Sequence, residues 1–121
     1  MSTTPLSTSA QLSNSVWTTV ITVDSPLASA VVNIRYLLNN LDIPSKLRAA
    51  IVPISFDNNS GVPAASQYVQ PVDIILGPAG VEAGIIEDTG VVILAGYKLV
   101  AKVDTGIVAC RAHGFGRNQG A

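Results

Sequence analysis

ASAVVNIRYLLNNLDIPSKLRAAIVPISF, residues 28–56, decides the fold of this chain, because it contains two strand-like runs around one turn. In the first run apolar residues recur at every second position, which is the period of a half-buried strand and not of a helix. These residues are Ala30, Val32, Ile34, Tyr36 and Leu38. Residues 39–45 contain several turn formers and a proline. Beyond them Lys46 and Arg48 alternate with apolar neighbours, which places the cations on an exposed face. The stretch therefore predicts an antiparallel pair, with the second strand returning beside the first and a second sheet covering their apolar face.

The composition of the chain argues for some classes of protein and against others. The chain has 121 residues, of which 48% are hydrophobic, enough to bury a core within a single domain. Its one cysteine, Cys110, cannot form an intrachain disulfide, so nothing indicates oxidising secretion. A net charge of −1 with 12% charged residues argues against a nucleic-acid partner, because phosphate neutralisation needs clustered Lys and Arg.

The hydropathy of the sequence indicates where the protein is located and whether it associates with other chains. No apolar run approaches the roughly 20 residues of a membrane helix, and residues 1–5 lack the basic and apolar regions of a signal peptide. We therefore expect a soluble protein with no membrane partner, which stays where it is made or is packaged. A mean hydropathy of +0.43 with so few charges leaves little polar surface to keep copies apart. The composition favours a homo-oligomer or a member of a larger assembly.

Residues 1–15 are expected to form a flexible N-terminal arm. Nine of the first 14 residues are Ser, Thr, Gln or Asn, a composition that does not favour packing. Two interpretations stay open, a frayed end and an arm that orders on a neighbouring subunit or an underlying shell. In the second, Leu6 and Leu12 would be the assembly contacts, since they are its only sizeable apolar side chains after Met1.

Residues 16–115 are expected to form the folded domain, followed by a loose C-terminal tail at residues 116–121. Alternating runs occur at residues 16–23, 68–76, 97–103 and 107–115. Ile85 and Ile86 precede a turn expected at residues 87–90, and a short apolar run follows at 91–94. Pro71 cannot donate to a central ladder, so its strand should lie at a sheet edge or be bulged. Eight strand-like runs without a convincing helix predict an all-β fold, an antiparallel β-sandwich of the jelly-roll type. The polar loop at residues 57–66 is either a solvated connector or a contact loop.

The sequence offers little for catalysis. Cys110 and His113 are the only residues of their kinds, and three positions apart on one strand they should point to opposite faces, which excludes a Cys-His dyad within the chain. The segment Gly77-Pro78-Ala79-Gly80 precedes no helix and is a turn, so it does not form a phosphate-binding loop. We therefore expect no catalytic, cofactor-binding or metal-binding residues.

The triplet Asp-Thr-Gly occurs at residues 88–90 and 104–106, and the same triplet carries the catalytic carboxylate of aspartic proteases. Such an enzyme needs each triplet in its own lobe or subunit, followed by a flap and substrate-binding strands. Only 31 residues follow Gly90 here. The second triplet also lies in a hairpin whose turn favours Asp and Gly for backbone reasons alone. The pattern therefore argues against a protease.

Several runs resemble small β-sandwich structural proteins of tailed phage virions, notably those of cyanophages. They are WTTVITV (17–23), AVVNIR (30–35), KLRAAI (46–51), VDIIL (72–76), EDTGVVILAGYKLV (87–100) and VACRAHGF (108–115). The resemblance covers about residues 16–115 and involves no catalytic motif. It implies a non-enzymatic protein of the virion, assembled in the host cytoplasm, which attaches to a capsid or tail and is commonly a trimer.

We therefore expect a capsid decoration or cement protein that stabilises the head, with the major capsid protein or other virion proteins as partners. A tail, baseplate or fibre component is one alternative. A small adhesion or carbohydrate-binding module is another, because β-sandwiches often carry such sites on their loops. Sugar sites usually need several exposed aromatic rings, whereas Trp17, Tyr36 and Tyr68 fall on faces expected to be buried.

Overall fold

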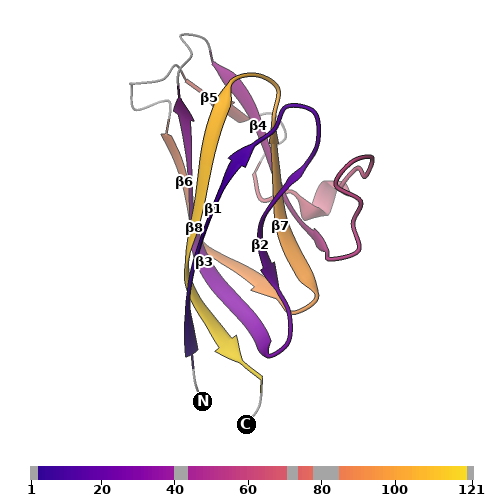
Figure 1. Cartoon of the computed structure of the whole chain (residues 1–121), viewed down its shortest axis with the longest axis vertical. Helices are drawn as coiled ribbons and strands as arrows, with labels where there is room; N and C mark the ends of the chain where they lie inside the picture. The colour runs from indigo at the N-terminus through magenta and orange to yellow at the C-terminus, as the bar shows by residue number, and fades with distance from the viewer. Residues whose placement is uncertain (1–2, 40–43, 71–73, 78–84, 120–121) are drawn as a thin grey trace.

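The computed structural model describes residues 3–39, 44–70, 74–77 and 85–119, which form eight strands and one short helix (Figure 1). The strands are β1 (Thr3–Leu12), β2 (Thr18–Val23), β3 (Leu27–Asn39), β4 (Ser45–Pro53), β5 (Ile74–Leu76), β6 (Ile85–Leu94), β7 (Tyr97–Val103) and β8 (Ile107–Asn118). The helix is the 3-10 turn η1 (Ala65–Gln67). Within the described residues no helix is long and apolar enough to cross a membrane.

The strands form two four-stranded antiparallel sheets. Sheet A has the order β1-β8-β3-β6, and sheet B has the order β2-β7-β4-β5. The pairs are β1 with β8, β2 with β7, β3 with β6, and β4 with β5. The chain is therefore one long hairpin, folded in such a way that successive pairs lie alternately in sheet A and sheet B. This is the double-sheet, eight-stranded arrangement of a jelly roll. The predicted all-β sandwich is confirmed.

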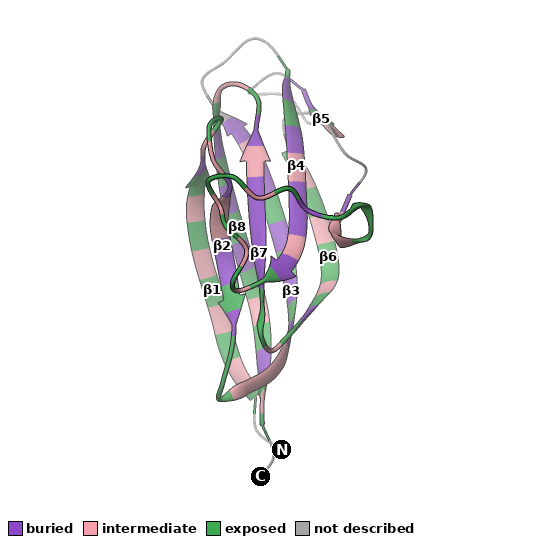
Figure 2. Ribbon diagram, turned by 90° about the vertical axis from the view of Figure 1, so that its right-hand side faces the viewer, coloured by how far each residue is buried: buried purple, intermediate pink, exposed green. Residues whose placement is uncertain are grey.

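The core lies between the two sheets and follows from the alternation in the sequence. Each inner face supplies every second residue of its strands, as the stripes of buried and exposed residues in Figure 2 show. The largest fully buried side chains are Tyr36, Ile34, Leu38, Leu47, Leu76, Ile93 and Leu99.

The structure corrects the predicted pairing of residues 28–56. β3 pairs with β6 and β8 in sheet A, whereas β4 pairs with β5 and β7 in sheet B, so the two runs face each other across the core. Both runs carry one strongly apolar face, which either arrangement would bury. Alternation fixes which face of a strand is buried and leaves its neighbour undetermined. The expected turn lies mostly at residues 40–43, outside the described residues.

The structure also corrects the flexible arm expected at residues 1–15. β1 is an edge strand of sheet A, and its ladder with β8 runs from Thr3 opposite Arg117 to Leu12 opposite Val108. Leu12 is buried in the core and Leu6 packs against it, so both leucines stabilise this chain's own sandwich. The sandwich consequently extends from Thr3 to Asn118, and residues 116–118 of the tail expected at residues 116–121 belong to β8.

Two other elements differ from their predictions. Of the strand expected at residues 68–76, the described residues show β5, at the predicted edge position, and residues 71–73, with Pro71, lie outside the described residues. The turn expected at residues 87–90 is a β-bulge inside β6, where two residues oppose Asn33 on β3. Gly90 takes the left-handed conformation there (φ 67°), and its N–H donates to the Asn33 side-chain oxygen at 2.9 Å.

Candidate functional site

Cys110 and His113 lie on opposite faces of β8, as the sequence predicts. Cys110 is buried on the inner face of sheet A, where burial raises the pKa of its thiol to about 12. His113 lies exposed on the opposite face of the same strand. A thiol held protonated in the core, with no imidazole on its own face, is a packed side chain and a poor nucleophile.

The two Asp-Thr-Gly triplets are structural and lie apart. The first lies on β6 of sheet A, and the second connects β7 of sheet B to β8 of sheet A, so it is a crossing between the sheets and not the predicted hairpin turn. Asp88 lies on β6, where partial burial raises its pKa against the opposing effect of a hydrogen bond from the Gln70 amide. Asp104 follows β7 and accepts hydrogen bonds from the Lys46 N–H (2.7 Å) and the Ser45 hydroxyl (3.3 Å). Each carboxylate has its own partners, so the pair does not form a shared-proton dyad.

The described part of the chain shows no group of residues that would bind a metal ion or a phosphate. No cluster of three or more His, Cys, Asp or Glu side chains occurs among these residues. Of the expected turn at residues 77–80, the described residues include only Gly77, which is buried.

A small group of polar side chains lies at the inner face of sheet A. Tyr36 on β3 is fully buried and stands opposite Cys110 on β8, and its hydroxyl has no hydrogen-bond partner among the described residues. Burial raises the pKa of Tyr36 far above its usual range, and Cys110 and Asp88 add to the effect. The side-chain oxygen of the buried Gln70 also has no hydrogen-bond partner within the described part of the chain. Two polar atoms of this group are therefore buried without a hydrogen bond from the described residues, which lowers the stability of the folded state.

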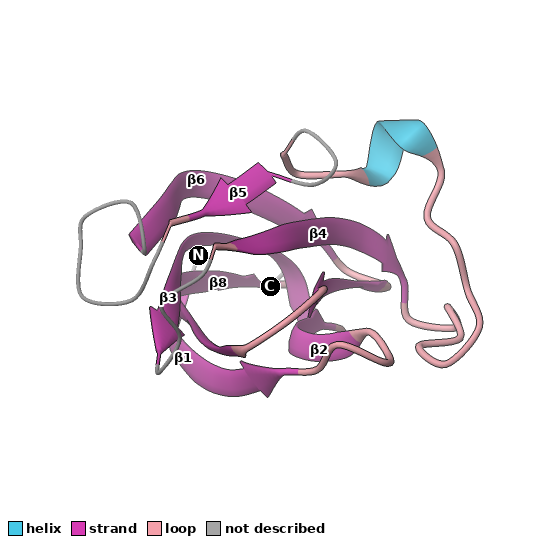
Figure 3. Cartoon of the chain, turned by 90° about the horizontal axis from the view of Figure 1, so that it is seen from above, coloured by secondary structure: helices cyan, strands magenta, loops and turns pink. Residues whose placement is uncertain are grey.

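The outer face of sheet B is partly covered by the chain between β4 and β5, which projects beyond β4 in Figure 3. A second apolar cluster forms beneath it from Trp17, Ala50, Val52 and Val100, with Phe56 and Tyr68 packed against them. Lys98, almost fully buried, donates to the Phe56 carbonyl (3.0 Å) and to the Asn58 side-chain oxygen (2.8 Å). These contacts attach residues 56–58, at the start of the predicted loop, to the sheet.

The outer face of sheet A, in contrast, is not covered by any described residues. One row across its four strands is apolar and exposed: Pro5 on β1 lies opposite Phe115 on β8, which lies opposite Val31 on β3, which lies opposite Val92 on β6. The exposed fractions are 60% for Phe115, 50% for Val31 and 55% for Val92. Leu94, two residues further along β6, is 57% exposed. These five residues are called the apolar row below.

Polar and charged rows adjoin the apolar row on the same face. Asn33 and His113 form the next row, and beyond them Arg35 pairs with Glu87 (2.8 Å) and stands opposite Arg111. A shallow hollow of about 610 Å³ extends from Ser29 to His113 beside Phe115. With Arg117 also exposed, the described residues give the outer face three guanidinium groups and one carboxylate.

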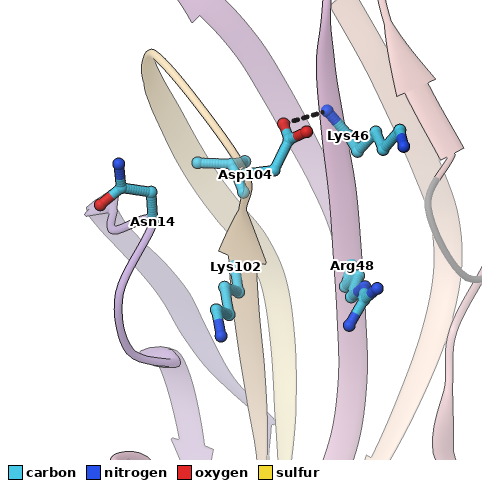
Figure 4. Close-up of a pocket in the computed structure, with 6 residues that line it drawn as sticks. Asn14, Lys46, Arg48, Lys102 and Asp104 are labelled. Atoms are coloured by element: carbon cyan, nitrogen blue, oxygen red, sulfur yellow. Dashed lines mark hydrogen bonds between the residues drawn. The ribbon is translucent and has the colours of Figure 1, made fainter.

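A second charged surface lies on the part of sheet B that the β4–β5 segment leaves open (Figure 4). Lys102 on β7 stands directly opposite Arg48 on β4, and Lys46 lies two residues from Arg48. Together with Asn14, Val103 and Asp104, these side chains line a hollow of about 340 Å³. Lys46, Arg48 and Lys102 are called the basic patch below.

The sequence predicts the cations on the outer face of β4, but it does not predict that the residues of the apolar row, or those of the basic patch, lie together. The signal for the apolar row was present, because Val31 next to Val32 and Val92 next to Ile93 place apolar side chains on both faces of their strands. Only the register brings them, with Phe115, into one row. Similarly, Arg48 and Lys102 are 54 positions apart and become neighbours through the β4–β7 ladder.

No protein-family model matches the chain, and no curated protein matches it. The sheet order alone therefore defines its class, an eight-stranded jelly roll. Its distinguishing surfaces are the uncovered face of sheet A and the basic patch of sheet B.

Proposed function

We propose that this protein is a non-enzymatic structural component of a tailed-phage virion, a decoration or cement protein that attaches to the head through the outer face of sheet A. The apolar row carries the proposal. Contiguous exposed apolar side chains on a flat sheet are costly in water, and they mark surfaces that another protein covers. The jelly roll and the resemblance of its strand runs to virion proteins support the same role.

The composition of this face favours a protein partner over a sugar. Phe115 is the single Phe, Tyr or Trp side chain on the face among the described residues, and its neighbours across the ladder are Pro5 and Val31. A sugar platform usually combines stacking rings with hydrogen-bonding groups at their edges. Aliphatic neighbours around one ring provide instead the apolar centre of a protein interface, with the adjoining Arg and His rows as its polar rim.

The charges on this face indicate that its partner is not a second copy docked face to face. Among the described residues this face carries three guanidinium groups and one carboxylate, and that carboxylate, Glu87, is already paired with Arg35. Two such faces would bring like charges together, which is unfavourable when they are desolvated. A shell protein with acidic groups around an apolar stripe, such as the major capsid protein, would complement it.

The proposal includes self-association into a homo-oligomer through other surfaces, and a trimer is the state that the resemblance implies. The low density of charged residues, 12% of the chain, supports it. Light scattering coupled to gel filtration measures the molar mass directly. A monomer that also stays monomeric on the particle would refute this part of the proposal.

Two experiments test the main proposal. A mass-spectrometric inventory of purified virions should contain the protein, and its absence from the particle would refute the virion role. Rebinding of purified protein to heads that lack it tests the surface. Phe115→Ala should weaken binding roughly 5- to 30-fold, since about 1–2 kcal/mol of apolar burial is lost. The control is Val62→Ala, which truncates an apolar side chain that is 85% exposed in the β4–β5 segment. Equal binding by the two variants would exclude the apolar row as the attachment surface.

A further inference from the structure

We infer that the free edge of β1 accepts an extended segment of the shell protein as a fifth strand of sheet A. This inference rests on the proposed function and adds to it the way in which the partner chain attaches. Three features of β1 support it: its regular edge, the direction of its free main-chain groups and its place at the end of the apolar row.

Of the four sheet edges, β1 is the least protected among the described residues. Free edges are templates for strand pairing, and proteins protect them with bulges, charges, prolines or short strands. β6 has its bulge opposite Asn33 and the carboxylates of Glu87 and Asp88, β2 is bulged after Thr19, and the described part of β5 has three residues. β1 has ten residues in an unbroken register with β8, and after Pro5 it continues over residues 6–12 with no charged side chain.

The position of Pro5 indicates which main-chain groups of β1 are free. A proline inside a ladder has no N–H to donate, so its nitrogen faces away from the neighbouring strand. In an antiparallel ladder, residues bonded to that neighbour alternate with residues whose N–H and C=O point the other way. Ser7, Ser9 and Gln11 have the parity of Pro5, so their N–H and C=O groups point to the free edge.

No described segment occupies this edge. Among the described residues, the main-chain hydrogen bonds of β1 are those of its ladder with β8. β1 accordingly lies at the margin of the molecule in Figure 2. Ser7, Ser9 and Gln11 each offer one donor and one acceptor there, which is the pattern that strand addition uses. In that mode main-chain bonds supply affinity, and the alternate side chains of the added strand supply specificity.

The apolar row indicates the chemistry of the added strand. The row ends at the free edge, because its last member, Pro5, lies on β1. An added strand places one side chain beside Pro5 on the outer face, and an apolar side chain there would extend the row over a fifth strand. Further along, it would lie beside Ser7 and Ser9, which small polar side chains suit. The expected occupant is an extended, uncharged segment with an apolar residue beside Pro5, continuous with the proposed attachment face.

The β1 strand of a second copy fits this edge less well. Apart from Pro5, its outer-face residues are Thr3, Ser7, Ser9 and Gln11, all of them polar. The apolar row would therefore continue only with Pro5 beside Pro5, and in that register neither proline has an N–H to donate. In the other registers the row would end beside a Ser, Thr or Gln side chain. The sequence of β1 thus favours a different chain as the occupant.

Proline substitution at the free edge tests the inference, with rebinding to heads that lack the protein as the assay. Ser9→Pro removes an outward N–H and places a ring in the path of the added strand, so binding should fall about tenfold or more. Ser9→Ala keeps the N–H and should lose far less. Thr8→Pro tests the direction of the groups: the Thr8 N–H faces β8, so this variant should have a much lower thermal midpoint than Ser9→Pro.

Ala65→Pro is the matched control. It introduces a proline at the exposed first position of η1, where the preceding Ala64 is extended (φ −68°, ψ 153°) and compatible with a following proline. This variant should bind heads as the wild type does. Thermal midpoints from circular dichroism report whether each variant is folded.

A loss of binding in Ser9→Pro, with a thermal midpoint near that of the wild type, would support strand addition. Equal binding by Ser9→Pro and Ala65→Pro would overturn it, while weaker binding by Phe115→Ala would still uphold the proposed function. Unfolding of Ser9→Pro to the extent seen in Thr8→Pro would show that the edge is not free and refute the inference. A lower molar mass of Ser9→Pro with unchanged head binding would show that the edge joins copies of this chain instead. Heads that do not bind the wild type would refute both proposals.

Discussion

Replacing Tyr36 by Phe should stabilise the sandwich. The ring of Tyr36 is fully buried in the core, and its hydroxyl has no hydrogen-bond partner among the described residues. In the unfolded chain water solvates that hydroxyl, so folding loses those hydrogen bonds without replacement, at a cost of about 1–3 kcal/mol. Phenylalanine keeps the ring and removes the unsatisfied group. After a small loss of packing where the oxygen was, we expect a gain of about 1 kcal/mol.

Urea denaturation followed by circular dichroism measures this gain. The midpoint should rise while the slope with denaturant stays constant, because the surface exposed on unfolding hardly changes. A gain of 1 kcal/mol corresponds to roughly 3–6 °C in the thermal midpoint for a domain of this size. Tyr97→Phe is the matched control, since the Tyr97 side chain is exposed at the start of β7, and it should leave both midpoints unchanged. If Tyr36→Phe instead lost 1 kcal/mol or more, the hydroxyl would have to be hydrogen-bonded in solution, and the reasoning would be refuted.

Three further outcomes follow from the structure. Asp88→Asn should raise the thermal midpoint at neutral pH, because the folded-state pKa of this carboxyl is raised and its ionised form therefore costs stability above that pKa. The advantage of Asn should fade as the pH falls through the raised pKa and be lost below the ordinary value near 3.8, and a constant advantage down to pH 2 would contradict this. Gly114→Ala should lose about 1–3 kcal/mol in urea denaturation, since a Cβ there would lie 2.0 Å from the Val31 carbonyl oxygen of β3, whereas Gly116→Ala should lose less because its Cβ would meet only the movable side chain of Leu27 (2.7 Å). Deleting residues 1–12 should destabilise the domain by several kcal/mol in the same assay, because it removes β1 and the buried Leu12, and an unchanged midpoint would show that β1 is dispensable.

The sequence predicted which side of most strands is buried, because alternation with period two reports burial directly. In β8, Val108, Cys110 and Ala112 are buried, and His113 faces outward as expected. The same signal cannot assign a strand to a sheet, since either neighbour can cover the same apolar face. For this reason the pattern of residues 28–56 predicts one antiparallel pair, although β3 and β4 lie in opposite sheets.

In β1 and β6 the composition and the periodicity of the sequence indicate different structures. Residues 4–12 place Thr4, Leu6, Thr8, Ala10 and Leu12 on one parity, and this is the parity that faces the core. Their polar content indicated disorder, yet Thr is a favourable strand residue at an edge. Glu87-Asp88-Thr89-Gly90 has turn composition, and a glycine with positive φ serves a bulge as well as a turn. The basic patch and the apolar row depend on register between distant segments, which no local pattern contains.

The central position of β8 in sheet A has a consequence for how the chain is made. β1 pairs only with β8 in its sheet, and about a hundred residues separate the two strands, so during synthesis β1 is complete long before its partner exists. At 5–20 residues per second the delay is roughly 5–20 s. An unpaired strand rich in Val and Ile would be prone to aggregate over such a time. The Ser and Thr content of β1, with Leu6 and Leu12 as its only large apolar side chains, keeps this strand compatible with water until β8 arrives.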